Sequence, residues 1–277
     1  MRKRSRFIFI FLWILLLCLI LIAIFFTDGK ANEESLKVVM NDAVLHEDNK
    51  IDFFGLKAVN PAFISALTVS GFLLIFAAFI RIFVISRFKI VPGKFQILLE
   101  ELVGYFDNLA KTNSPRRNGF LGAYVFAAGV YIFFGTIFEI LGFQAVTIKN
   151  ISISLPAPLS DINAAIALGV LSYLVIMSGG IAGNGIKGIG LTLKDFSLPF
   201  SMSFRLFGAL LSGLLVNELV YYYINLSFIL PVAVGLMFTL LHALIQAYVL
   251  TVLTALFYGE VTKKSNKNKV HIRRKLK

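Results

Sequence analysis

This sequence contains little cysteine and few charged residues. Only one cysteine, Cys18, occurs among the 277 residues, which excludes an intrachain disulfide. Charged residues make up 15% of the chain, whereas hydrophobic residues make up 58%. A soluble domain of this size does not need so large an apolar share. The composition therefore indicates a polytopic membrane protein.

Signatures of an enzyme active site are missing as well. No group of residues in the sequence resembles a metal cluster or a catalytic triad. The glycine-rich stretch from Gly183 to Gly190 lacks the lysine–hydroxyl ending of a phosphate-binding loop, so we interpret its glycines as turn residues. We therefore expect no catalytic residues, no cofactor and no metal. The inverted repeats that mark many secondary transporters are also not visible.

Long apolar runs are what the sequence has in abundance. About 20 apolar residues cross a bilayer as an α-helix. The runs predict an all-α fold with about six transmembrane helices, the fifth and sixth forming a long hairpin. The predicted spans cover roughly residues 7–26, 61–85, 120–143, 162–179, 195–226 and 231–258. The first run is longer than the core of a signal peptide, about 7–15 residues, so an uncleaved anchor is favoured over a cleaved leader.

One further helix is predicted between the second and third spans. Residues 91–106 carry apolar side chains at helical spacing, with Gln96, Glu100 and Glu101 between them. This stretch is too polar to span a membrane. Its pattern predicts an amphipathic helix lying at the membrane interface.

The basic residues are distributed unevenly between the two sides of the predicted spans. They lie beside apolar runs, so the net charge of +12 does not indicate nucleic-acid binding. With six spans, 21 basic residues fall on the side of both termini and 5 on the other. The positive-inside rule then places both termini in the cytoplasm. The predicted division is an N-terminal basic segment and anchor (1–26), an extracytoplasmic loop (27–60), a membrane domain (61–260) and a basic cytoplasmic tail (261–277).

Arg205 is a charged residue in the middle of the predicted fifth span. A guanidinium stays protonated in proteins, and placing one mid-membrane costs about 2.5–3.5 kcal/mol on insertion scales. Ser201, Gly208 and Ser212 share its helix face, and such small residues let another helix approach closely. Arg205 is therefore the leading candidate for function. The alternative is an arginine that snorkels to the interface or pairs within a structural bundle.

Other polar residues gather in or beside the last spans. Thr239, His242 and Gln246 share one face of the sixth span because they lie three and four residues apart. Three more lie toward the outer side, in the third, fourth and fifth spans: Glu139, Asn163 and Glu218. The set predicts a hydrated path from the outside to the level of Arg205. Any one member could instead make a structural hydrogen bond between helices.

These residues resemble a known family, subunit a of F-type ATP synthases. The segment Ser203-Phe-Arg205-Leu-Phe-Gly208 resembles that family's arginine helix, and Leu244–Ala255 resembles its last helix. Shorter matches resemble the cytoplasmic helix of bacterial members, the start of the following hairpin and a connector: Val91–Gln96, Ser160–Asn163 and Lys187–Gly190. The matches are in order and cover about residues 60–258.

The sequence departs from the family pattern at three positions. Ala209 replaces a usual asparagine, while Leu214 and Thr239 occupy positions where the family carries ionisable groups. Glu218 and His242 lie one turn beyond them, and we infer that they supply ionisable groups to the same aqueous path. The two shifts run in opposite directions along an antiparallel hairpin.

The resemblance implies a proton-translocating stator subunit of the membrane Fo sector, not catalytic by itself. Its fifth and sixth helices would face a rotating ring of c subunits, each carrying one membrane carboxyl. Arg205 would attract each carboxylate as it loses its proton, and would block direct leak between two half-channels. The implied outward half-channel uses Glu139, Asn163, Glu218, His242 and Gln246, and Ser201 is the candidate for the inward one.

The implied partners are the c-ring, peripheral-stalk b subunits, the rest of the F1Fo complex and membrane lipid, with no nucleic acid. The bacterial-type amphipathic helix favours a bacterial plasma membrane. Two other hypotheses remain open from the residues alone. One is a secondary transporter that binds an anionic substrate with Arg205, and the other is a purely structural membrane protein.

Overall fold

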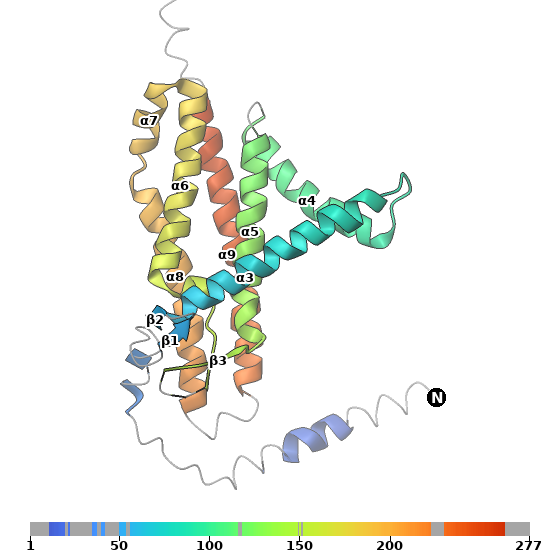
Figure 1. Cartoon of the computed structure of the whole chain (residues 1–277), viewed down its shortest axis with the longest axis vertical. Helices are drawn as coiled ribbons and strands as arrows, with labels where there is room; N and C mark the ends of the chain where they lie inside the picture. The colour runs from blue at the N-terminus through green and yellow to red at the C-terminus, as the bar shows by residue number, and fades with distance from the viewer. Residues whose placement is uncertain are drawn as a thin grey trace, which may run out of the picture.

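The computed structural model describes residues 11–19, 22, 35–37, 40–41, 50–53, 56–115, 118–148, 150, 152–222 and 230–263. The elements run in chain order (Figure 1) as β1 (Ile51–Phe53), β2 (Leu56–Val59), α3 (Pro61–Phe79), η1 (Ile80–Val84), η2 (Ile85–Arg87), α4 (Lys94–Asn113), α5 (Gly119–Ile140), β3 (Gln144–Val146), β4 (Ser152–Ser154), η3 (Pro158–Ser160), α6 (Ile162–Asn184), α7 (Ile186–Leu193), α8 (Ser197–Tyr222) and α9 (Leu230–Thr262).

Five segments of the described chain are helical, long and apolar enough to cross a membrane: Pro61–Arg87, Gly119–Ile140, Ile162–Asn184, Ser197–Tyr222 and Val232–Thr262. They confirm the predicted all-α, polytopic membrane fold. The predicted first span lies mostly outside the described residues, although residues 11–19 within it form an exposed helix. Most of the predicted loop at 27–60 and nearly all of the basic tail also lie outside them.

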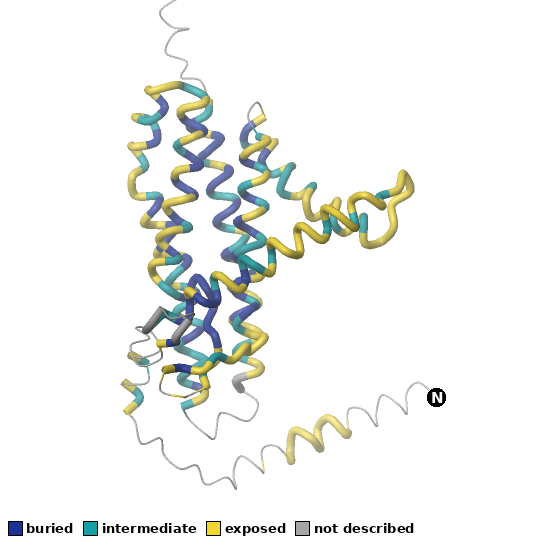
Figure 2. The backbone as a smooth tube through the Cα atoms, in the orientation of Figure 1, coloured by how far each residue is buried: buried dark blue, intermediate teal, exposed yellow. Residues whose placement is uncertain are grey.

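The core is a bundle of α5, α6, α8 and α9, in which α9 packs against the other three (Figure 1). Buried residues follow the inner sides of these helices (Figure 2). They come from every member of the bundle and include Leu121, Ile132, Ile176, Met202, Leu206 and Leu250. Because the outer faces are equally apolar, the helices lack the polar stripe that would reveal their orientation in a soluble protein.

Small residues bring the bundle helices close together. A Cβ added at Gly169 of α6 would overlap Oγ of Ser203 in α8, and would lie 3.0 Å from the carbonyl oxygen of Pro199. A Cβ at Gly129 of α5 would lie 2.9 Å from the ring of Phe106 in α4. Such contacts are the usual means by which membrane helices pack, since small side chains let the backbones approach.

Helix α3 leaves the bundle at an angle (Figure 1). Its first turns pack on α5 and η3, with Ala62, Ile64 and Val69 buried. Beyond Val69 the helix is exposed on nearly all sides (Figure 2) and ends in a wider π-helical turn, η1, which carries Arg81. This outer part is apolar, as a lipid-facing helix must be.

The predicted amphipathic helix is present as α4, at Lys94–Asn113 rather than 91–106. Pro92 and the N-cap Gly93 precede the first turn of α4. The helix ends at Ser114, because the residue before a proline, here Pro115, disfavours helical geometry. Its last turns pack on α5 and α9 through Phe106, Leu109 and Ala110. The apolar stripe of its first half is exposed, including Phe95, Leu98 and Leu102.

The loop predicted between the third and fourth spans contains an antiparallel hairpin of β3 and β4, followed by the buried turn η3. Gln144 pairs with Ser154 at the open end of the hairpin. Residues 155–160 are all buried, and the turn η3 within them packs against α3, α6 and α8. This segment therefore closes one end of the bundle.

The glycine-rich connector is largely helical, which corrects the expectation of turn residues at 183–190. Helix α6 continues to Asn184, and only Gly185, at φ 61°, makes the turn into α7. Two of the other glycines, Gly183 and Gly188, serve close packing. A Cβ at Gly188 would overlap the carbonyl of Gly180, and a Cβ at Gly183 would lie 2.6 Å from the carbonyl oxygen of Thr262.

Candidate ion pathway between α8 and α9

Helices α8 and α9 form the antiparallel hairpin that the sequence predicted, and two contacts between them mark their register. A Cβ at Gly213 of α8 would lie 3.5 Å from Nδ1 of His242 in α9. A Cβ at Gly235 of α9 would lie 3.9 Å from Oδ1 of Asn217 in α8. Each of these polar side chains therefore faces a glycine of the other helix.

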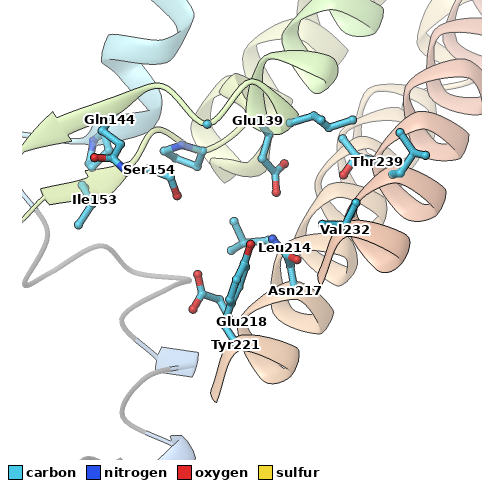
Figure 3. Close-up of a pocket in the computed structure, with 16 residues that line it drawn as sticks. Glu139, Gln144, Ile153, Ser154, Leu214, Asn217, Glu218, Tyr221, Val232 and Thr239 are labelled. Carbon is cyan, nitrogen blue, oxygen red and sulfur yellow. The ribbon is translucent and has the colours of Figure 1, made fainter. Parts of the chain in front are cut away.

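A cavity of about 760 Å³ opens beside the end of this hairpin (Figure 3). Its walls come from α5, α8 and α9, from the β3–β4 segment and from Pro61 at the start of α3. The polar side chains in these walls all offer oxygen atoms as hydrogen-bond acceptors. They belong to Glu139, Gln144, Ser154, Asn217, Glu218, Tyr221 and Thr239. The cavity lies where α5 and α8 end and where α9 begins. In the predicted topology this is the extracytoplasmic end.

The cavity brings together two carboxylates that are far apart in sequence. Glu139 lies in the last turn of α5 and points into the cavity, while Glu218 approaches from α8 (Figure 3). Both residues are half-buried. A roomy cavity with carboxylates, an amide and a hydroxyl in its walls is suited to hold hydrogen-bonded water and to exchange protons with it.

A row of polar residues continues from this cavity along α9. Thr239 lines the cavity and is 9% exposed, and Gln246, two turns further on, is 6% exposed. Between them lies the half-buried His242, whose ring centroid is 5.9 Å from that of Phe238. From Gly235 to Gln246 the helix rises about 16 Å. The row therefore leads from the cavity into the bundle.

Arg205 lies on a different surface. Leu214, which lines the cavity, is nine residues further along α8, and at 3.6 residues per turn this places it about 180° around the helix. Arg205 is exposed, as are Ser201, Gly208 and Ser212. Within the described residues Arg205 has no hydrogen bond or ion pair, and nothing lies within 4 Å of a Cβ added at Gly208. The arginine and its small-residue face thus point out of the bundle.

Only some of the site residues predicted from the sequence lie close to one another in the structure. Glu139 and Glu218 line the cavity, and His242 and Gln246 follow it along α9. Asn163 lies elsewhere, exposed in the first turn of α6, and its backbone N–H donates to Asp161 Oδ1 at 2.7 Å. Ser201 is exposed on the side of Arg205, away from the cavity lining.

Sequence reasoning missed Asn217, which lines the cavity beside Glu218. The available signal was its position four residues after Gly213, which places both on one face of α8. No set of three His, Cys, Asp or Glu side chains in the described ranges is placed to hold a metal ion.

The fold and the site define a polytopic helical membrane protein with a polar path between its last two helices. The family profile described as "ATP synthase A chain" matches residues 64–259. The chain belongs to this family, whose members form the proton-translocating part of the Fo sector.

Two curated relatives carry the name ATP synthase subunit a and come from two strains of Cereibacter sphaeroides. Each is similar to this chain at 25% identity over 183 residues, which covers 62% of this chain and 70% of the relative.

Proposed function

We propose that this chain is the stator of the Fo motor, and that it conducts protons through two half-channels that meet at Arg205. The observation that carries the proposal is the position of Arg205. Its charge is exposed on a face of small residues, on the side of α8 opposite to the cavity. A fixed positive charge in lipid alone would be costly. A partner helix carrying a carboxylate would compensate it.

The partner that fits this face is a ring of c subunits, each with one membrane carboxyl. The exposed Ser201, Gly208 and Ser212 leave room for a passing helix. As a ring carboxyl reaches Arg205, the guanidinium favours its ionised form and so promotes release of its proton. The same charge repels protons and prevents direct flow between the half-channels.

The outer half-channel begins at the cavity. Protons reach Glu139 and Glu218 from the extracytoplasmic side and pass along the row that includes His242 and Gln246. Its final step leads between α8 and α9 to the exposed side of the hairpin. Ser201 belongs to the inner half-channel in this proposal, and Asn163 lines the outer approach at the start of α6.

We further propose that the chain resides in a bacterial plasma membrane with both termini in the cytoplasm, and that peripheral-stalk b subunits bind it. The 21-to-5 distribution of basic residues supports the orientation, and the exposed apolar stripe of α4 supports its placement at the cytoplasmic interface. Residues 1–26, 27–60, 61–260 and 261–277 then form the anchor, the outer loop, the membrane domain and the inner tail.

The position of Arg205 argues against a secondary transporter that binds an anionic substrate. Such an arginine would have to point into a substrate cavity. The cavity seen here is lined by the opposite face of α8, and Arg205 does not contribute to it.

The decisive experiment measures ATP-driven proton pumping in inverted membrane vesicles. We expect Arg205→Ala to assemble into the complex but to abolish pumping, with passive proton leak unchanged or raised. Arg205→Lys should rescue poorly, because lysine lacks the planar fork and can lose its proton when buried. Arg87 is an exposed arginine at the end of η2, and Arg87→Ala serves as the matched control. Near-normal pumping by the Arg205→Ala complex would refute the proposal.

A further inference from the structure

Asn217 lines the carboxylate cavity and faces Gly235, at the cavity end of the polar row of α9. We propose that its side-chain amide holds water in the outer proton path and so connects Glu139 and Glu218 with His242. This inference rests on the function proposed above, and it adds to that function a positioning residue that neither the sequence motifs nor the family resemblance indicates.

The first argument is the state of the amide oxygen. Oδ1 of Asn217 is buried and has no hydrogen-bond partner in the part of the chain that the structure describes. Most buried polar atoms in proteins have a partner, and leaving one without is unfavourable. Asn217 also lines a cavity of about 760 Å³, where one water requires only about 30 Å³. Oδ1 itself has almost no surface open to the cavity, so a water must enter beside it from the cavity to act as its donor.

The second argument is the space opposite the amide. Oδ1 faces Gly235, where a Cβ would be only 3.9 Å away. One turn along α8, Gly213 faces His242 in the reciprocal arrangement. Between the two approaches lies Thr239, which is buried and lines the same cavity. The paired glycines leave room beside each polar side chain, so hydrogen-bonded groups can follow one another between the helices.

The amide acts by position and does not itself titrate. Oδ1 accepts a hydrogen bond from a water, which receives one proton from the cavity side and releases one to the next hydrogen-bonded group toward Thr239 and, beyond it, His242. The number of protons on the water and on Asn217 is unchanged after each transfer. Without the acceptor, the water is no longer held in line between the cavity carboxylates and the imidazole.

The test uses the assembled complex in vesicles, with passive proton flux measured after removal of the soluble ATPase head and normalised to complex content. Asn217→Leu keeps a similar size and removes the amide, and we expect a two- to tenfold loss of flux, about the value of one hydrogen bond. Asn217→Ser keeps a hydrogen-bonding oxygen and should recover most of the flux. Asn108→Leu, an exposed amide of α4, should leave the flux unchanged.

A solvent isotope measurement separates positioning from a loss of folded complex. The ratio of flux in H2O to flux in D2O should rise in Asn217→Leu, because proton transfer through the path then limits the rate. Loss of active complexes would lower the flux without changing this ratio. Gly235→Ala should also lower the flux, because its methyl group occupies the space beside Oδ1, whereas Gly190→Ala, with nothing within 4 Å, should not.

Wild-type flux in Asn217→Leu, an unchanged isotope ratio, or a serine variant as slow as the leucine variant would each overturn the inference. The function proposed for the chain is tested separately by Arg205→Ala. If that variant abolishes pumping while Asn217→Leu conducts normally, only the role of Asn217 is wrong. If Arg205→Ala pumps normally, the proposed function itself is wrong.

Discussion

Asn60 donates from Nδ2 to Oδ2 of Asp161 across a distance of 2.5 Å, and each residue is the N-cap of a different helix. Asn60 Oδ1 accepts from the backbone N–H of Ala62 at the start of α3. Asp161 Oδ1 accepts from the N–H groups of Asn163 and Ala164 at the start of α6. The two helix starts are therefore joined by their capping side chains, directly beside Pro61 at the cavity.

Breaking this link should destabilise the end of the bundle that carries the cavity. Asp161→Ala removes a cap and leaves the Asn60 amide without its acceptor, which we expect to cost about 1–3 kcal/mol. Asp161→Ser keeps the cap and loses only the link to Asn60, so it should be intermediate. The thermal stability of the detergent-solubilised complex provides the measurement. Equal stability of the wild-type and alanine complexes would show that the link is dispensable.

Loss of any one titratable residue of the proposed outer proton path should slow proton pumping without abolishing it. We expect Glu218→Gln and His242→Ala to assemble normally and to slow ATP-driven pumping by about fivefold, because water and neighbouring side chains substitute for one lost group. Pumping is measured at several values between about pH 6 and 8, the range in which histidine can change charge.

Glu260→Gln is the matched control for these two variants. Glu260 is an exposed carboxylate at the other end of α9, and its substitution should leave pumping unchanged. Wild-type pumping by both path variants at every pH would contradict the assignment of Glu218 and His242.

Helices α6 and α8 lie so close together at Gly169 that a side chain added there should destabilise their packing. A methyl group there would overlap Ser203 Oγ and press on the Pro199 carbonyl. Because backbone is involved, we expect Gly169→Ala to destabilise the chain by about 1–3 kcal/mol, as overpacking does. The fraction of chain recovered in the assembled complex after heating would report this loss. Recovery equal to that of Gly190→Ala would show that the two helices can separate at little cost.

The orientation of the chain leads to a labelling prediction. In a Cys18→Ser background, cysteines introduced at Ser5 and Asn268 should be protected from an impermeant thiol reagent added to intact cells, because both termini are expected in the cytoplasm. A cysteine at Ile148, which is 49% exposed beside the β3–β4 hairpin, should be labelled and so serves as the positive control. Labelling of both terminal cysteines from outside would reject the six-span topology.

The helices could be predicted from the sequence because length and hydropathy decide whether a segment spans a membrane. Their boundaries shifted where local chemistry competed with that pattern. Proline and glycine set the start of α4, and close glycine contacts let α7 form where turns were expected. The two β-hairpins were missed because their strands are only three or four residues long.

The candidate site was predictable only in part. Arg205 and the carboxylates were conspicuous because charge is costly in an apolar run. Their arrangement was not, since helices that are apolar on all sides give no sign of which face is buried. The cavity depends on how α5 and the β3–β4 segment meet the α8–α9 hairpin, and the buried acceptor of Asn217 becomes visible only in three dimensions.

The reciprocal placement of Gly213 opposite His242 and of Gly235 opposite Asn217 also constrains how this hairpin can diverge. A methyl group at either glycine would already be in van der Waals contact with the facing polar side chain, so any larger residue there would have to displace that side chain. From the family resemblance we infer that Glu218 and His242 supply the ionisable groups expected at Leu214 and Thr239. The size of the residue at each glycine position and the identity of the polar residue facing it are therefore expected to change together.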